Sequence, residues 1–137
     1  MNMRYPVKFD SDETGWAVIF PDIPEALTGG ATRAEALAMA QDALVTAFDF
    51  YFEDRRPVPP PSTEGEEFVD VPAGVAAKVL LLNAMLETKT SNADLARLLG
   101  TRPQDVQRIV NLGHNTKIDT IESALRVLGK RLEITVS

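Results

Sequence analysis

The sequence of 137 residues contains no cysteine and only one histidine, His114. The lack of cysteine excludes disulfides and thiolate metal sites, and His114 has no second histidine with which to share a metal. No stretch approaches the roughly 18 apolar residues of a transmembrane helix, and the N-terminus has no apolar core like that of a signal peptide. We therefore expect a cytoplasmic protein with no metal, no other cofactor and no membrane association.

Charge is distributed unevenly along the chain, whose net charge is −6. Residues 1–65 carry 5 Lys or Arg against 11 Asp or Glu, whereas residues 66–137 carry 9 of each. Within the second part, residues 88–117 carry 5 basic against 2 acidic side chains. An acidic half and a locally basic half indicate two different partners.

The chain begins with a pattern typical of a β-hairpin. Residues 3–10 and 14–20 are rich in β-branched and aromatic side chains and are separated by a polar turn. A loop with two prolines and two glycines follows, with room for a short third strand near Leu27 or Ala31. We expect these strands to form a small sheet.

A long helix is predicted after the strands, from Thr32 to about Glu53. Thr32 and Glu35 have the spacing of a capping box. The apolar residues that repeat at helical spacing, and that we expect to be buried, are Leu37, Leu44, Phe48 and Phe52. Strands covered by one helix make residues 1–56 a compact α+β domain.

Residues 54–66 contain four of the nine prolines, together with glycine and charged residues. This composition favours an extended chain without regular structure. We therefore predict a linker at residues 57–66, between the domain of residues 1–56 and a second domain of residues 67–137.

The second domain is predicted to be mostly helical. Pro72 suits the first turn of a helix that runs to about Glu87, and a further helix at residues 117–128 is ended by Gly129. The face of the first of these helices carries Val75, Val79, Leu82 and Leu86. Residues 68–71 and 131–136 each read as a short strand, and they are candidates to pair with each other as a small two-stranded element.

Residues 92–111 fit two short helices joined by a tight turn, which is the helix-turn-helix pattern. Ala96 provides the small residue that close packing of the helices needs, and Gly100 suits a turn with positive φ. The start of the second helix is ambiguous, because Thr101 with Gln104 has the spacing of a capping box while Pro103 would make Arg102 the cap. Two amphipathic helices of an ordinary small bundle would give some of the same matches.

A helix-turn-helix places side chains of its second helix against DNA bases. Arginine suits guanine, and glutamine or asparagine suits adenine. The residues expected at base edges and adjacent phosphates are Arg102, Gln104, Gln107, Arg108 and Asn111, and those expected at the DNA backbone are Thr101, Asn115 and Lys117. One such motif makes few contacts, so we expect a homodimer that reads two half-sites.

The acidic half invites an enzymatic interpretation, which the residue positions do not favour. A metal-dependent nuclease needs several carboxylates to converge. Asp10, Asp12 and Glu13 fall in or beside the hairpin turn, where acids are usually solvated, and the acids of the long helix lie on more than one face. We therefore expect no catalysis. Tyr51 and the acids near it better suit a basic protein partner.

Residues 15–44 resemble the signature of the HicB antitoxin family. They include Gly-Trp-Ala-Val-Ile-Phe-Pro-Asp-Ile-Pro at 15–24, a Thr-Gly-Gly turn at 28–30 and a helix opened by Thr with Glu-Ala. Residues 48–53, the proline-rich stretch and residues 79–83 extend the resemblance to the helix-turn-helix subfamily. The chain departs from the family at Glu25 and Ala26, where many members carry Gly-Cys.

The resemblance implies a type II antitoxin without catalytic activity. Its N-terminal half would be a partial ribonuclease-H-like fold that binds and blocks a HicA-like toxin, a basic mRNA-cleaving ribonuclease, and its C-terminal half would bind and repress the operon of the pair. The residues we expect at the toxin are Asp22, Glu25, Asp49, Tyr51, Glu53 and Asp54. The alternative is a stand-alone transcriptional regulator whose N-terminal domain senses a small ligand.

Overall fold

The computed structural model describes residues 3–137, which divide into two compact units. The sheet unit comprises residues 3–50 and 59–71, and the helical unit comprises residues 51–58 and 72–137. The proline-rich stretch is therefore shared: residues 59–66 pack with the sheet unit and residues 57 and 58 with the helical unit.

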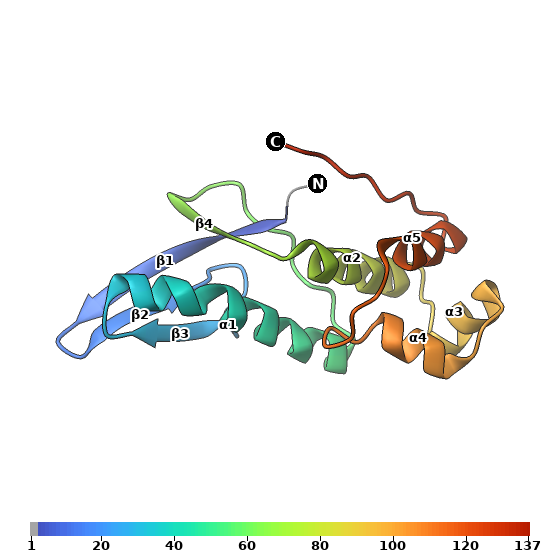
Figure 1. Cartoon of the computed structure of the whole chain (residues 1–137), viewed down its shortest axis with the longest axis horizontal. Coiled ribbons are helices and arrows are strands. Elements are labelled where there is room, and N and C mark those ends of the chain that lie inside the picture. The colour runs from blue at the N-terminus through green and yellow to red at the C-terminus, as the bar shows by residue number, and fades with distance from the viewer. Residues whose placement is uncertain (1–2) are drawn as a thin grey trace. The chain divides into compact units, whose positions relative to one another are not determined.

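The sheet unit contains a four-stranded antiparallel sheet in the order β3-β2-β1-β4 (Figure 1). Its strands are β1 (Arg4–Asp12), β2 (Gly15–Ile19), β3 (Leu27–Gly30) and β4 (Glu67–Asp70). The predicted hairpin of β1 and β2 and the short third strand are confirmed. Asp12 Oδ1 fixes the hairpin turn by accepting hydrogen bonds from the Thr14 amide (2.8 Å) and hydroxyl (2.6 Å).

The prediction that residues 68–71 pair with residues 131–136 is wrong. The first of these segments is β4, which pairs with β1 in the register Tyr5↔Val69, and residues 131–137 form no strand. Pairing with β1 buries Val69 against the apolar side of the sheet, whereas Ile134 and Val136 stay exposed. The sheet of the described residues contains only β1 to β4, so residues 131–137 are not part of it.

The helix α1 (Arg33–Asp54) covers one face of the sheet (Figure 1). The Tyr5 ring of β1 and the Phe48 ring of α1 lie 5.8 Å apart. The predicted cap of α1 is confirmed, since Thr32 Oγ1 accepts a hydrogen bond from the Glu35 amide at 3.1 Å. The buried residues Leu44 and Phe48 match the predicted face, but Leu37 does not, because its side chain is 43% exposed.

Small residues replace Leu37 at the contact between α1 and the sheet. Ala36 and Ala40 are fully buried there, and they lie two turns and one turn before Leu44. A Cβ added to Gly30 of β3 would stand only 2.7 Å from the Ala36 nitrogen. Gly30 therefore has no room for a side chain where β3 meets the first turn of α1.

The helical unit contains α2 (Ala73–Glu87), α3 (Asn92–Leu99), α4 (Pro103–Ile109) and α5 (Ile118–Val127). α2 packs on α5, and α3 packs on both α4 and α5. All four helices were predicted from the sequence to within a few residues. None of the helices in residues 3–137 combines the length and apolar character that are needed to cross a membrane.

The core of the helical unit uses a different side of α2 from the predicted one. Val79 and Leu82 are buried as expected. The cluster that α2 shares with the other helices, however, draws on a second set of its residues, namely Ala77, Leu81, Ala84 and Met85. These meet Leu95, Ala96, Val106, Ile109, Ile121, Ala124 and Leu125 from α3, α4 and α5. α2 therefore buries two sides, which explains its nearly continuous apolar sequence.

Candidate nucleic-acid and protein interfaces

Local structure fixes both ends of α3. At the start of α3, the Ser91 hydroxyl accepts from the Asp94 amide (3.1 Å) and the Asp94 carboxylate accepts from the Ser91 amide (3.2 Å). At its end, Gly100 has φ 68°, which favours glycine because a Cβ is strained there. No heavy atom lies within 4 Å of the position of an added Cβ. Glycine is therefore favoured at this position by the backbone conformation and not by a lack of space.

The start of α4 resolves the ambiguity about its cap. Pro103 is the first helical residue and Arg102 is the N-cap. The Asp105 carboxylate accepts hydrogen bonds from the Arg102 amide (3.3 Å) and the Thr101 hydroxyl (2.6 Å). The Thr101 hydroxyl, with the Arg102 side chain and amide, lowers the pKa of Asp105 to about 2. The carboxylate therefore stays charged and holds the turn at neutral pH.

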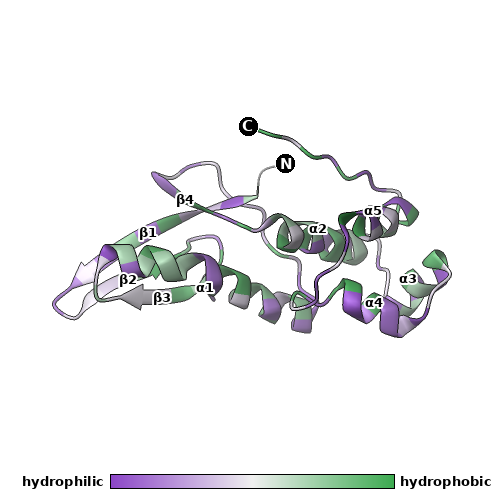
Figure 2. Cartoon of the chain, in the orientation of Figure 1, coloured by the Kyte–Doolittle hydropathy of each residue, from purple (hydrophilic) through white to green (hydrophobic). Residues whose placement is uncertain are grey.

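Three of the side chains predicted at DNA bases lie on the exposed side of α4. Gln104, Gln107 and Arg108 are exposed and share one face of the helix at spacings of three and four residues. None of their side chains makes a hydrogen bond or ion pair with the residues that the structure describes. The hydropathy colours of Figure 2 alternate along α4 accordingly, because its other side enters the core. Arg102 is also exposed but is paired with Asp105 at 3.4 Å.

Asn111 does not lie on α4 as predicted. The helix ends at Ile109, and Asn111 lies in the turn that follows, where its Oδ1 accepts a hydrogen bond from the Gly113 amide at 2.8 Å. The glycine and asparagine residues of this segment satisfy their backbone groups locally, which ends the helix earlier than the apolar spacing indicates. Asn111 is exposed, and so is the neighbouring His114.

A hollow of about 430 Å³ gathers four of the eight predicted DNA-binding residues. Thr101 and Arg108 reach it from the α3–α4 region, Asn115 and Lys117 from the loop before α5, and Asp105, His114 and Thr120 are among its other lining residues. Lys117 is exposed and is the N-cap of α5. Two cationic side chains therefore border a surface that also presents the first turn of a helix, and this combination suits a phosphate group.

The sequence reasoning missed Lys78 on α2, which holds the loop after α4 in place. The side chain is only 3% exposed. Its Nζ donates hydrogen bonds to the carbonyl oxygens of Asn111 (2.6 Å), Arg108 (3.3 Å) and His114. Burial lowers the pKa of Lys78 from its ordinary value. The available signal was one lysine within the apolar run of residues 75–82.

The predicted partner-binding acids of the N-terminal half differ in their exposure. Glu25, Asp49, Glu53 and Asp54 are exposed. Asp22 is half-buried, and its carboxylate accepts hydrogen bonds from the Ser62 amide and hydroxyl, both at 2.7 Å. Asp22 therefore holds the segment of residues 59–66 against the sheet unit.

Tyr51 is not an exposed contact residue. Its side chain is 4% exposed, and the Arg56 guanidinium lies 4.2 Å from the centre of its ring. Tyr51 lies three residues after Phe48 and seven after Leu44, so helical spacing places it on the apolar side of α1. Aromatic residues on such a side usually enter a core.

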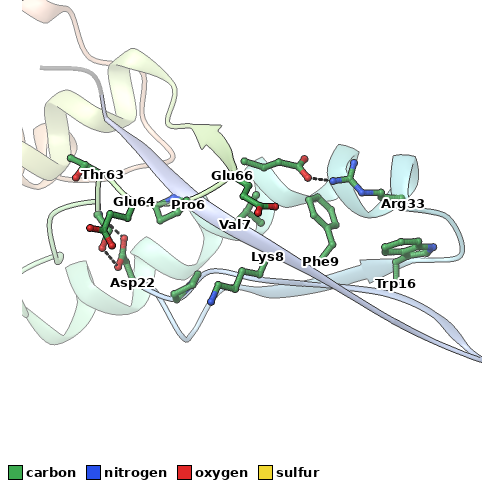
Figure 3. A pocket seen from close by; sticks show the side chains of 14 residues that line it. Pro6, Val7, Lys8, Phe9, Trp16, Asp22, Arg33, Thr63, Glu64 and Glu66 are labelled. Atoms are coloured by element: carbon green, nitrogen blue, oxygen red, sulfur yellow. Dashed lines mark hydrogen bonds and ion pairs between the residues drawn. The ribbon is translucent and has the colours of Figure 1, made fainter.

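A cavity of about 930 Å³ in the sheet unit lies beside the segment of residues 62–67 (Figure 3). Phe9 and Trp16 form its apolar part, and the Arg33 guanidinium lies 4.1 Å from the centre of the Phe9 ring. The charged groups around it have both signs: Lys8, Arg33, Asp22, Glu64, Glu66 and Glu67. Within residues 3–137 no group of three or more His, Asp or Glu side chains is placed to hold a metal ion.

Comparison with known proteins first defines a class, that of antitoxins from bacterial toxin-antitoxin systems. Residues 4–80 match the family model described as HicB_like antitoxin of bacterial toxin-antitoxin system. This match covers more than half of the chain, so the protein belongs to the HicB-like antitoxin family. The protein is therefore an antitoxin by homology and not an enzyme.

Relatives align over almost the whole chain. It is 79% identical over 133 residues to antitoxin HicB 2 of Photorhabdus laumondii, covering 97% of this chain and 96% of that one. It is 50% identical over 137 residues to antitoxin HicB of Escherichia coli K12, covering 98% and 99%. Antitoxin HicB of Pseudomonas fluorescens is 42% identical over 118 residues, covering 84% and 81%.

Proposed function

We propose that the protein binds and inhibits a HicA-like ribonuclease toxin and represses the operon that encodes both partners. The observation that carries the proposal is the family match, which makes the chain an antitoxin. An antitoxin needs a toxin partner, and the acidic N-terminal half suits a basic one, because opposite charges steer association. We regard this half as a partial ribonuclease-H-like fold without catalysis.

The DNA-binding part of the proposal rests on α3 and α4, which we take as a helix-turn-helix. α4 presents the unpaired side chains of Gln104, Gln107 and Arg108 to solvent, and these groups suit base edges. The nearby hollow is bordered by Arg108 and Lys117, which suits the phosphate backbone. A homodimer would place two such surfaces on two operator half-sites.

Two measurements test the two activities separately. Co-expression with the short basic protein encoded by the neighbouring gene should relieve the toxicity of that protein. In a gel shift at fixed salt, the purified chain should bind a DNA fragment from its own promoter in preference to a scrambled fragment of equal length. Persistent toxicity would contradict the first activity, and equal binding of both fragments would contradict the second.

The alternative function is a stand-alone regulator that senses a small ligand. The cavity beside residues 62–67 would be the binding site for that ligand. That cavity has the size of small-molecule pockets, with Phe9 and Trp16 on one side. Its mixed charges select no particular ligand class, and the family match favours the antitoxin. Promoter binding that does not respond to the neighbouring protein, together with unrelieved toxicity, would favour the alternative.

A further inference from the structure

The strand β3 lies at an edge of the sheet and carries no protection against pairing. No other strand pairs with its outer side within residues 3–137, and Figure 1 shows it beside α1. Edge strands are usually guarded by charged residues, prolines or bulges, yet β3 reads Leu-Thr-Gly-Gly. Its unpaired backbone groups are therefore open to another strand.

An apolar hollow of about 220 Å³ lies between β3 and α1. Three large side chains border it and remain exposed: Leu27 at 69%, Met39 at 48% and Phe50 at 50%. Single exposed apolar residues are common on protein surfaces. Three around one hollow, next to an unprotected edge strand, form a contiguous apolar surface of the kind that marks an interaction site.

The charge around this hollow has one sign. Among residues 3–137, the charged side chains that line it are those of Glu25 and Asp42. Asp49 lies two turns after Asp42 on the same side of α1, and neither aspartate forms an ion pair or hydrogen bond with the residues described. Burial beside apolar groups raises the pKa of Asp49, whereas a neighbouring cation would lower it. Asp42 and Asp49 therefore lack a cationic partner among residues 3–137.

We propose that this surface, formed by β3, Leu27, Met39, Phe50, Asp42 and Asp49, is where the toxin docks. An extended segment of the toxin pairs with β3, one of its large apolar side chains fills the hollow, and adjacent Lys or Arg side chains meet Asp42 and Asp49. The inference rests on the proposed toxin-binding function and adds the place and chemistry of the contact. The all-acidic rim selects the basic toxin over a second copy of this acidic half.

The test titrates the full-length chain with the purified toxin of the neighbouring gene by isothermal titration calorimetry. Leu27→Ser and Phe50→Ser should each raise the Kd at least tenfold, because they remove the apolar contact. The double variant Asp42→Lys and Asp49→Lys should also weaken binding at least tenfold and should reduce its dependence on salt. All four side chains are exposed or at the rim, so circular dichroism spectra should match that of the parent protein.

Matched controls come from outside this surface. Leu37→Ser changes an apolar residue of similar exposure that lies about 160° around α1 from Met39, and Asp10→Lys reverses an exposed charge on β1. Both should change the Kd less than twofold. Parent-like toxin affinity of both the serine and the lysine variants would overturn the docking site but not the antitoxin function, whereas a parent protein that binds no toxin would overturn both. If light scattering shows that Leu27→Ser reduces the oligomer while toxin affinity is unchanged, the surface joins copies of this chain and the inference is wrong.

Discussion

The Nζ atom of Lys78 lies 2.6 Å from the carbonyl oxygen of Asn111 and joins α2 to the loop that follows α4. The same ammonium group also donates hydrogen bonds to the carbonyl oxygens of Arg108 and His114. The loop it holds leads directly to Asn115 and Lys117. One buried cation therefore sets the position of the segment proposed to contact the DNA backbone.

Replacing Lys78 should affect both stability and operator binding. Lys78→Met keeps the apolar stem but leaves carbonyl oxygens without a donor, so we expect a loss of about 2 to 3 kcal/mol in the free energy of unfolding. Urea denaturation measures this loss, and gel shifts at a temperature where the variant is folded should show weaker operator binding. Lys89→Met, at an exposed position, is the control and should change neither quantity. Operator affinity equal to that of the parent would show that Lys78 does not position the DNA-binding loop.

Arg108→Ala tests the proposed contact with base edges. The guanidinium is exposed and unpaired within the described chain, so its removal should leave stability nearly unchanged. Operator binding should weaken by about 1 to 3 kcal/mol, measured by gel-shift titration at fixed salt. The control is Arg126→Ala, which removes an exposed arginine of α5 that pairs with Glu122 at 3.4 Å. Equal effects of the two substitutions would mean that only net charge matters.

Gly100→Ala and Gly74→Ala form a matched pair that separates backbone strain from space. Neither glycine has a heavy atom within 4 Å of an added Cβ, but only Gly100 has a positive φ, at 68°. Gly100→Ala should therefore cost about 1 kcal/mol, whereas Gly74→Ala in the first turn of α2 should be neutral or slightly stabilising. Thermal or urea unfolding measures both. A loss at Gly74 as large as that at Gly100 would contradict this account.

Local sequence patterns predicted the helices and the hairpin because capping residues, glycine and apolar spacing act within a few residues. These local patterns could not decide which segments pair when the segments lie far apart in the sequence. Residues 68–71 alternate much as residues 131–136 do, and only the assembled sheet shows that Val69 pairs with Tyr5. Leu37 was a better core candidate than Ala36 by apolarity, yet Ala36 is fully buried and Leu37 is 43% exposed.

In the candidate site, too, features set by local spacing could be predicted and those set by distant residues could not. Exposure of Gln104, Gln107 and Arg108 on one face of α4 could be predicted from helical spacing. The role of Lys78 could not, because its three acceptors lie at least 30 residues away in the sequence. Tyr51 looked like part of an acidic edge because its neighbours in the sequence are acidic, but a helix separates adjacent residues onto different sides.

Acid should weaken the turn between α3 and α4 through Asp105. The pKa of this carboxyl is about 2 in the folded chain against an ordinary 3.8. Because the folded-state value is the lower one, the carboxylate contributes stability that is present above pH 3.8 and is lost as the pH falls toward 2. An NMR titration of the Asp105 carboxyl carbon should give a midpoint near 2. In Asp105→Asn, the urea midpoint should fall less than in the parent between pH 5 and pH 2, whereas Asp119→Asn, the control for removing one exposed charge, should keep the parent's dependence. A midpoint at 3.8 would show that Thr101 and Arg102 do not hold this carboxylate in solution.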